Sequence, residues 1–146
     1  PSSEYDVPRL YKAVSFDRYI DEAAFVDFTH TAVARHPYSP VQLGGGRNAA
    51  LDITLTWVRR TRVNGGWNNY ADVSLGEATE AYEVEIYTTS GYTVVARTIT
   101  GLSTPTATYT AAQQTTDFGS AQATVYFKVF QISAAVGRGY EAKGVV

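Results

Sequence analysis

Apolar and polar residues alternate with a period of two along several stretches of the chain. Every second residue from Leu51 to Trp57 is apolar, and the same alternation runs through 82–86 and 125–131. This period is typical of a strand with one buried face and one face in solvent. The apolar members of these stretches define the predicted core, which centres on Trp57, Tyr82, Val84, Phe127 and Val129.

Turn residues separate further segments that are rich in β-branched and aromatic residues. These segments predict strands at 92–100, 106–109 and 140–146. The turns between them are Ser90-Gly91, Gly101 to Pro105 and Gly137-Arg138-Gly139. Short strands at nearly regular spacing predict an all-β fold, namely a β-sandwich.

One helix is expected within this β-sandwich. Thr110 and Gln113 have the spacing of a capping box, in which the two side chains and two backbone N–H groups satisfy each other. Residues 111–117 then form about two helical turns, which end at Phe118-Gly119. Phe118 is expected to close the bottom of the sandwich.

The first forty residues lack the regular alternation. Leu10 to Val14 favours a strand, whereas Phe16 to Phe28 mixes acidic and aromatic residues without a clear period. His36 to Pro40 holds two prolines three residues apart, which favours an extended linker. We therefore place a boundary after residue 40, with an N-terminal extension at 1–40 and the sandwich at 41–146. The extension is expected to need a preceding domain or a neighbouring subunit to bury Phe16, Tyr19, Phe25 and Phe28.

Composition excludes several classes of function. The 146 residues include 12 Lys and Arg against 14 Asp and Glu, so no global field attracts a nucleic acid or an anionic membrane. The chain has no cysteine, which excludes disulfides and thiolate metal sites. No apolar run approaches the length of a membrane span, so membrane insertion is not expected. The chain begins with Pro1 and contains no Met, which predicts that it is a piece of a longer protein.

Four short motifs carry a resemblance to a known fold family. The spacing of Trp57, Tyr82-Glu83-Val84, Phe127-Lys128-Val129 and Gly137-Arg138-Gly139 resembles a fibronectin type III domain. In that family a Trp on the second strand packs under a Tyr of the third. The family also carries a corner tyrosine early in its sixth strand, whereas the inward parity here places Val125 at that position.

A second, more specific resemblance covers Leu10 to Gly139. The chain looks like the C-terminal region of the large tail-tip hub proteins of siphophages and gene transfer agents, which are host-specificity or tip-attachment proteins. The motifs that carry it are Tyr38 to Val41, Trp57 to Arg62, Leu75 to Ala78, Tyr109 to Gln114, Asp117 to Gly119 and Gln131 to Ser133.

This second resemblance implies a structural virion component and not an enzyme. It implies assembly in the bacterial host cytoplasm, a place at the virion tail tip, and a homotrimer in the full-length hub. The implied partners are other tail-tip proteins and receptor-binding proteins, with a host surface glycan or protein as a further candidate.

The stretch from Val58 to Tyr70 is the main candidate contact site. It is expected to be a loop that joins two strands, with Asn64-Gly65-Gly66 at a bend. Arg60 and Arg62 share one face while Arg59 lies on the other, so three arginines do not converge on one ligand. The residues expected to contact a partner or a glycan are Arg59, Arg60, Arg62, Trp67, Asn68, Asn69 and Tyr70, together with Arg138 and Tyr140 in the later turn. Loop 101–105 is a further candidate.

Patterns for metal binding are missing. His30 and His36 lack a third donor at a suitable spacing, so they are interpreted as ordinary exposed or partner-facing residues. The acidic residues of the extension lack the central Gly of a calcium loop and are interpreted as a solvated face. These residues are Asp17, Asp21, Glu22 and Asp27.

Patterns for catalysis and cofactor binding are missing as well. Glu83 and Glu85 lie about 7 Å apart on the outward face of one strand, a separation that glycosidase carboxylates also use. An outward face offers no enclosure, so we interpret them as surface charges. Motifs for a nucleophile elbow, a dinucleotide or a zinc protease site do not occur, and neither a catalytic residue nor a cofactor is expected.

A second function hypothesis comes from a different class. The same sandwich suits an accessory carbohydrate-binding module of a secreted polysaccharide-active enzyme, in which Trp67 and Tyr70 stack on a sugar ring. A row of coplanar exposed aromatic side chains would favour this alternative.

Overall fold

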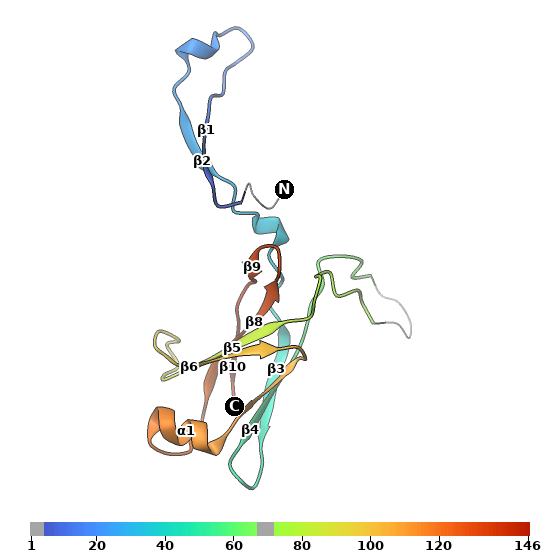
Figure 1. The fold of residues 1–146 in the computed structure, drawn as a ribbon, viewed down its shortest axis with the longest axis vertical. Helices are drawn as coiled ribbons and strands as arrows, with labels where there is room; N and C mark the ends of the chain where they lie inside the picture. The colour runs from blue at the N-terminus through green and yellow to red at the C-terminus, as the bar shows by residue number, and fades with distance from the viewer. Residues whose placement is uncertain (1–4, 67–71) are drawn as a thin grey trace. The chain divides into compact units, whose positions relative to one another are not determined.

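The computed structural model describes residues 5–66 and 72–146, and the chain divides into two compact units, Pro1–Arg35 and His36–Val146 (Figure 1). The first unit contains β1 (Pro8–Tyr11), η2 (Ile20–Glu22), β2 (Val26–Thr29) and η3 (Val33–Arg35). The second contains β3 (Val41–Arg47), β4 (Ile53–Val58), β5 (Tyr82–Tyr87), β6 (Val95–Leu102), β7 (Thr106–Tyr109), α1 (Ala111–Phe118), β8 (Tyr126–Ser133), β9 (Gly137–Arg138) and β10 (Ala142–Val145).

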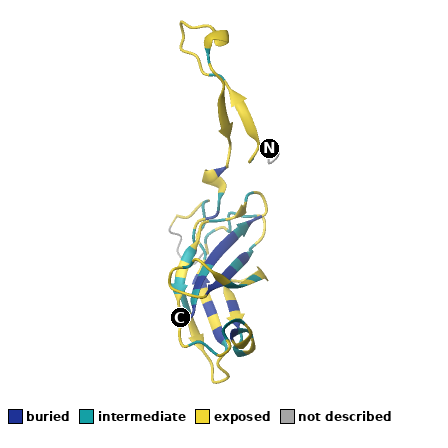
Figure 2. Ribbon diagram, turned by 90° about the vertical axis from the view of Figure 1, so that its left-hand side faces the viewer, coloured by how far each residue is buried: buried dark blue, intermediate teal, exposed yellow. Residues whose placement is uncertain are grey.

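Within residues 5–35, the first unit is a hairpin without a hydrophobic core. Strands β1 and β2 pair antiparallel, with Pro8 opposite Thr29 and Tyr11 opposite Val26. All eight residues of the two strands are exposed, and they appear yellow in Figure 2. A two-stranded hairpin is only marginally stable in water by itself.

The second unit is a β-sandwich, so the predicted all-β sandwich is confirmed. One sheet has the strand order β3-β4-β7, and the other has the order β10-β8-β5-β6 with β9 paired to β8. Every pairing in the second unit is antiparallel. The inner faces of the two sheets enclose the buried residues, which are dark blue in Figure 2.

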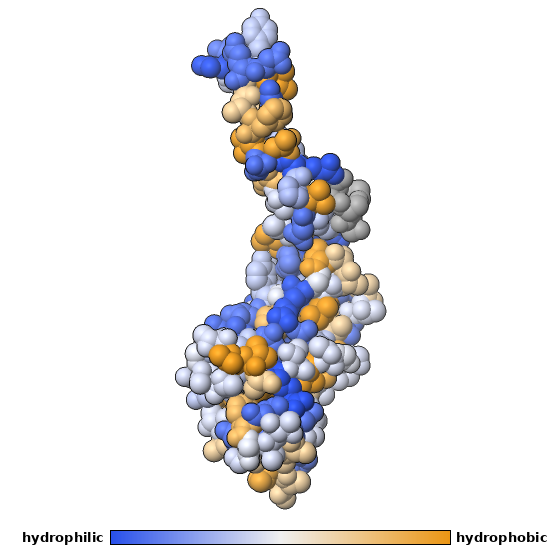
Figure 3. Space-filling model, turned by 60° about the vertical axis from the view of Figure 1, so that its left-hand side comes forward, coloured by the Kyte–Doolittle hydropathy of each residue, from blue (hydrophilic) through white to orange (hydrophobic). Residues whose placement is uncertain are grey.

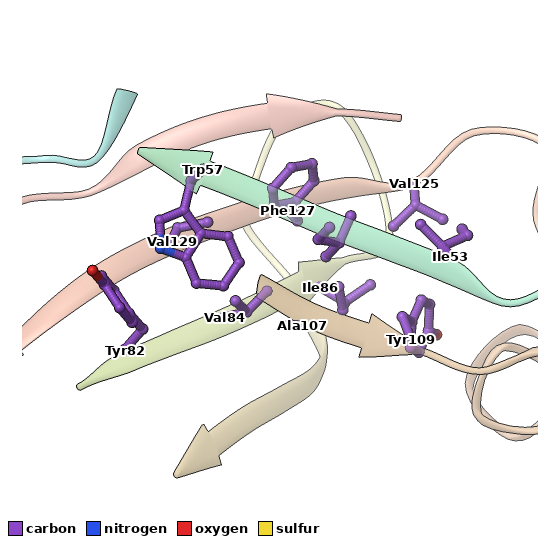
Figure 4. Close-up of a cluster of buried hydrophobic side chains, with 11 residues drawn as sticks. Ile53, Trp57, Tyr82, Val84, Ile86, Ala107, Tyr109, Val125, Phe127 and Val129 are labelled. Carbon is purple, nitrogen blue, oxygen red and sulfur yellow. The ribbon is translucent and has the colours of Figure 1, made fainter. Parts of the chain in front are cut away.

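The core forms around the predicted pair of rings (Figure 4). The centroids of Trp57 and Tyr82 lie 5.3 Å apart, and the rings meet edge to face at 71°. Both side chains are buried, since Trp57 exposes 3% and Tyr82 exposes 1%. The other predicted core residues Val84, Phe127 and Val129 expose 0%, and the cluster also contains Ile53, Leu55, Ile86, Ala107, Tyr109 and Val125. Burial of such side chains contributes about 1.5–3 kcal/mol each.

Strand β3 was not predicted, because its three successive glycines show no period-two pattern. It forms by pairing with β4, where Gly45 lies opposite Leu55. A side chain at residue 45 would bring its Cβ within 2.7 Å of the Thr54 carbonyl oxygen, so only glycine fits. The glycines that hide the strand in the sequence thus allow its close approach to β4.

Strand β6 begins later than predicted. Tyr92 has φ of 53°, a left-handed conformation that cannot continue into a strand, and β6 starts at Val95. The strand then runs through Gly101 to Leu102, so the predicted break is limited to 103–105. The pairing of β6 with β5 also shifts register twice, once near each end.

Helix α1 has the predicted cap. The backbone N–H of Gln113 donates to the Thr110 hydroxyl, and the backbone N–H of Thr110 donates to the Gln113 side chain. Gly119 closes the helix with a left-handed φ of 82°. Phe118 is partly buried against the core, as the sequence predicts. Among the described residues, no helix is long and apolar enough to cross a membrane.

An ion pair ties α1 to both sheets. Arg97 of β6 donates to both carboxylate oxygens of Asp117 at 2.6 and 2.8 Å, and the Tyr109 hydroxyl at the end of β7 donates to Asp117 Oδ2 at 2.8 Å. Burial alone would raise the pKa of Asp117, but the bonds from Arg97 and Tyr109 lower it below its ordinary value. The helix is therefore held to one strand of each sheet.

The second unit begins at His36, five residues before the predicted boundary. Pro37 is fully buried, and its carbonyl oxygen accepts a hydrogen bond from the Tyr140 N–H at 3.0 Å. Gly139 passes so close that an added Cβ would lie 2.6 Å from the same oxygen. Residues 36–40 therefore pack as part of the sandwich and do not act as a free linker. The two prolines indicate extended backbone, but their burial depends on residues a hundred positions away.

Candidate functional site

Strand register places the three predicted contact segments at one end of the sandwich. Tyr82, which follows the 59–81 loop, pairs with Leu102 at the end of β6 and with Gln131 near the end of β8. Ile132 in turn pairs with Arg138 of β9. The 59–81 loop, the 103–105 turn and the 134–140 turn therefore share this end, which we name the loop end.

Two arginines fasten the outgoing arm of the long loop to its returning arm. Arg59 donates to the Asp72 carboxylate at 2.7 Å and to the Val73 carbonyl at 2.8 Å. Arg62 donates to the Glu77 carboxylate at 2.5 Å, and these two side chains expose 18% and 6%. Both guanidinium groups are thus bound within the loop itself.

The third arginine fastens the loop to the start of the second unit. Arg60 donates through Nε to the Ser39 carbonyl at 2.9 Å and through Nη2 to the Ser39 hydroxyl at 3.0 Å. Its guanidinium also lies 5.3 Å from the centroid of the Tyr38 ring. The three arginines therefore diverge, as the sequence indicates, and each holds a different segment.

The bend and tip of the loop are only partly described. Asn64 has a left-handed φ of 52°, as expected for the bend, whereas Gly65 and Gly66 do not. The predicted contact residues Trp67, Asn68, Asn69 and Tyr70 lie outside the described residues. Val63, just before the bend, exposes 44% of its surface.

Arg138 belongs to a cluster that the sequence does not reveal. Its guanidinium donates to Glu85 at 2.9 Å, pairs with Glu83, and lies 4.3 Å from the centroid of the Phe130 ring. The carboxylates expose only 18% and 11%, so interpreting Glu83 and Glu85 as surface charges was wrong. Arg138 covers them from β9, more than fifty residues away in the chain. This arrangement compensates both negative charges.

A tyrosine and lysine cluster covers another part of the same sheet face. The rings of Tyr87, Tyr92 and Tyr126 meet at centroid distances of 5.5 and 6.0 Å. The ammonium of Lys128 lies 5.0 Å from the Tyr87 centroid, and Lys143 lies 5.5 Å from that of Tyr92. Burial raises the pKa of the Tyr87 hydroxyl, and its hydrogen bond to Glu85 raises it further. In the sequence, only the alternation of side-chain direction along β5 and β8 indicates this cluster.

The two histidines have ordinary contacts. His30 stacks on the Tyr5 ring at 5.3 Å and accepts a hydrogen bond from the Ala32 N–H. His36 is hydrogen bonded through Nδ1 to the Arg138 carbonyl, and its ring lies 6.0 Å from that of Tyr140. In residues 5–66 and 72–146, no three His, Asp or Glu side chains are grouped as metal ligands would be.

The N-terminal unit exposes large apolar side chains, including the four aromatic residues singled out in the sequence. Phe16 exposes 108% of its reference area, and Tyr19 exposes 77%. Figure 3 shows apolar side chains gathered along this unit. Contiguous exposed apolar surface of this kind marks interaction sites in soluble proteins. The exposed set also includes Leu10, Tyr11, Val14, Ile20, Phe25, Val26, Phe28 and Val33.

Comparison with known proteins identifies the fold. Neither a family model nor a curated protein sequence matches the chain. Among solved structures, domains d3–d4 of the rat CD45 extracellular region align with a TM-score of 0.52 and 14% identity, over 98% of this chain and 64% of that one. A structure described as a myokine has a TM-score of 0.46 and 13% identity, over 75% of this chain and 95% of that one.

The FN5 domain of Drosophila Lar also aligns, with a TM-score of 0.45 and 12% identity over 75% of this chain and 94% of the Lar domain. This chain spans about two thirds of the length of the CD45 fragment, namely 64%. Together with the strand order and the packing of Trp57 on Tyr82, the likeness shows that the second unit has a fibronectin type III-like fold.

Proposed function

We propose that this chain is a peripheral domain of a phage-like tail-tip hub, a host-specificity protein that mediates attachment between proteins at the tail tip. In this proposal the full-length hub is a homotrimer that is assembled in the bacterial cytoplasm and carried at the virion tail tip. The partners are other tail-tip proteins and receptor-binding proteins, and contact with a host surface glycan or protein is a further role.

The exposed N-terminal unit is the observation that carries this proposal. Its apolar side chains include Phe16, Tyr19 and Phe28, which have no core to enter within the hairpin. Monomeric proteins rarely expose such a surface, whereas a component of a larger assembly buries it against a neighbour. The tail-tip resemblance covers Leu10 to Gly139 and so includes most of this unit, although the motifs that carry it all lie in the second unit.

The loop end supports a general role in protein contacts. A sandwich is a rigid body that presents loops at its ends, and such loops commonly carry binding residues. Here Arg59, Arg60 and Arg62 stiffen the long loop by separate internal contacts. Tyr140 exposes 47% at the same end. A preorganised surface of this kind lowers the entropic cost of binding.

A non-enzymatic role agrees with the carboxylate cluster. Glycosidases need one carboxyl group with a raised pKa and one free carboxylate. Arg138 instead pairs with both Glu83 and Glu85, so neither carboxylate is free. We therefore infer that the pair stabilises the β9 turn and takes no part in proton transfer.

The geometry of the aromatic rings favours protein contacts over the carbohydrate-binding alternative. A flat sugar platform needs coplanar rings, but Tyr87 and Tyr92 meet at 64° and Tyr92 and Tyr126 at 81°. In the hairpin, Tyr11 and Phe28 also meet at 81°. Glycan-array binding by the chain that is lost in Trp67→Ala would replace the tail-tip proposal with the carbohydrate-binding one.

Electron microscopy of particles released by the encoding phage or bacterium tests the tail-tip proposal. Gold-labelled antibodies raised against residues 36–146 should mark the distal end of each tail. Antibodies against the major capsid protein should mark only the heads of the same particles. Particles that carry no label at their tail tips, while the chain is detected elsewhere in the culture, would overturn the proposal.

A further inference from the structure

Within the described residues, hydrogen bonds anchor the outgoing arm of the 59–81 loop as far as Val63. Figure 1 shows this loop projecting from the sandwich between β4 and β5. The Val63 carbonyl oxygen accepts hydrogen bonds from the Thr61 hydroxyl at 2.9 Å and from the Ser74 hydroxyl at 2.7 Å. The Val63 N–H donates to the Thr61 hydroxyl at 3.1 Å. Residues 64–66 lie beyond these contacts, and all three are exposed.

Asn64 and Gly65 form an Asn-Gly pair at this exposed bend. Asn64 has a left-handed φ of 52°. In the part of the chain that the structure describes, neither the Asn64 side-chain amide nor the Gly65 N–H has a hydrogen-bond partner. Gly65 also has no side chain beside its nitrogen. The amide carbon of Asn64 and the Gly65 nitrogen can therefore approach each other by bond rotations that break no hydrogen bond.

Asn48 is also exposed, but its amide is held in place. Its Oδ1 accepts a hydrogen bond from the Asp52 N–H at 2.9 Å, and its Nδ2 donates to the Asp52 carboxylate at 3.2 Å. Its backbone N–H donates to the Asp52 carbonyl at 3.0 Å, and its carbonyl accepts from the Leu51 N–H at 3.0 Å. The next residue is Ala49, whose methyl group lies beside the backbone nitrogen. The fold thus fixes the amide of Asn48 but not that of Asn64.

We propose that Asn64-Gly65 is a modification site, at which Asn64 deamidates spontaneously in the folded chain to aspartate or isoaspartate. The Gly65 nitrogen loses its proton to hydroxide and attacks Asn64 Cγ. The new C–N bond closes a five-membered succinimide ring, the Cγ–Nδ2 bond breaks, and Nδ2 takes up protons from water and leaves as ammonia. Water then opens the ring at Cγ to give aspartate, or at the main-chain carbonyl carbon to give isoaspartate. The net reaction consumes water and releases ammonia, without oxidation or reduction.

The reaction changes the charge and the backbone of the candidate contact loop. The formal net charge of the chain changes from -2 to -3, since a neutral amide becomes a carboxylate. Isoaspartate also lengthens the main chain by one carbon between residues 64 and 65. The contacts of Arg59 with Asp72 and of Arg62 with Glu77 lie before the bend and remain possible. Chains of different age therefore present chemically different forms of the same loop. The inference rests on residues 59–66 and does not depend on the tail-tip role.

Peptide mass spectrometry of the full chain, incubated at mildly alkaline pH, tests the proposal. Asn64 should gain the mass of an amide-to-acid exchange at least about tenfold faster than Asn48, because only Asn64 is free to reach the attacking nitrogen. Fragment ions separate Asn64 from Asn68 and Asn69, which share its tryptic peptide. A rate at Asn64 no higher than that at Asn48 would overturn the proposal.

Two glycine substitutions identify the attacking nitrogen. Gly65→Ala should slow the reaction at Asn64 about tenfold, because the added methyl group crowds that nitrogen. The new Cβ would lie 3.3 Å from the Thr61 methyl group, which is a side-chain end that can shift. Gly66→Ala is the matched control, since its Cβ would meet nothing within 4 Å, and it should leave the rate unchanged. Equal rates in the two variants would contradict attack by the Gly65 nitrogen.

The same measurement in guanidinium chloride separates the contribution of the fold from that of the local sequence. Unfolding removes the contacts of Asn48 with Asp52, so the rate at Asn48 should rise at least about tenfold. The rate at Asn64 should stay within about threefold, because the folded bend leaves its amide as free as an unfolded chain does. A rise of more than about tenfold at Asn64 would show that the fold protects this residue, and the proposal would then be wrong.

Discussion

The two units of this chain differ in how far their apolar residues are buried. In the sandwich, Ile53, Leu55 and Phe127 expose 0% of their surface, whereas in the hairpin Leu10 exposes 64% and Phe28 exposes 54%. The sandwich closes two sheets over a shared core, and the hairpin has only one two-stranded sheet with both faces exposed. The first unit therefore buries little apolar surface of its own, whereas the second unit is stabilised by its core.

The largest expected effect on stability comes from a substitution in the core of the second unit, and a substitution in the hairpin serves as its comparison. Trp57→Ala should lower the free energy of unfolding by about 3–5 kcal/mol, because it leaves a cavity beside Tyr82. Phe28→Ala removes a ring of the hairpin and should change the sandwich by less than about 0.5 kcal/mol. Urea denaturation followed by circular dichroism measures both variants. Comparable losses would mean that the hairpin contributes to the sandwich core.

The next effect concerns the ion pair that holds α1. Asp117→Asn should cost about 2 kcal/mol, because it leaves the largely buried Arg97 without a charged partner. Asp72→Asn is the matched control, since that carboxylate pairs with Arg59 but is 84% exposed, and it should cost less than about 0.5 kcal/mol. If both substitutions lowered the free energy of unfolding equally, the pair of Arg97 and Asp117 would not hold the helix.

The lowered pKa of Asp117 also predicts that the stability of the fold depends on pH. The folded state lowers the pKa of Asp117 below its ordinary value of 3.8, so the stabilisation is present above about pH 4. It is lost as the pH falls through the lower pKa of the folded state. Asp117→Asn should therefore flatten the stability profile below about pH 4, measured by urea midpoints at successive pH values.

A pair of truncations locates the border between the units. Deletion of residues 1–35 should leave a sandwich that unfolds cooperatively. Deletion of residues 1–40 also removes Pro37 and Ser39, which accept hydrogen bonds from Tyr140 and Arg60, and should cost about 1–2 kcal/mol more. Equal stability of the two truncations would move the border to residue 40.

The smallest effect concerns the helix cap. Thr110→Ala removes the acceptor of the Gln113 N–H and should cost about 1 kcal/mol. Thr108→Ala, at an exposed position on β7, should stay within about 0.5 kcal/mol. Thermal unfolding of both variants distinguishes the loss of the cap hydrogen bond from the effect of replacing any threonine by alanine.

Local patterns in the sequence predict those parts of the fold whose causes are local. The alternation at 53–57 matches β4, although Leu51 has a positive φ and lies outside the strand, and the capping-box spacing matches α1. Each depends on neighbours a few residues away. Strand β3 was missed because its glycines become a strand only through pairing with β4. The predicted start of β6 at Tyr92 was wrong, because Tyr92 has a positive φ and belongs to the turn before the strand.

The candidate site was less predictable for the same reason. The positions of Arg59, Arg60 and Arg62 in a loop follow from the sequence, but their partners Asp72, Ser39 and Glu77 come from separate segments. Parity indicates that Glu83 and Glu85 face outward, yet Arg138 covers them from a distant turn. A sequence pattern gives the direction of a side chain, whereas its burial depends on long-range neighbours.

The two register shifts along β6 have a consequence for solubility. β6 ends the strand order of its sheet, and an unpaired edge of eight residues can template the addition of strands from other molecules. The shifts bend this edge, and Arg97 turns its charge toward Asp117 on the helix. A bent edge that carries a charged side chain disfavours the addition of strands from other molecules and so opposes cross-β stacking.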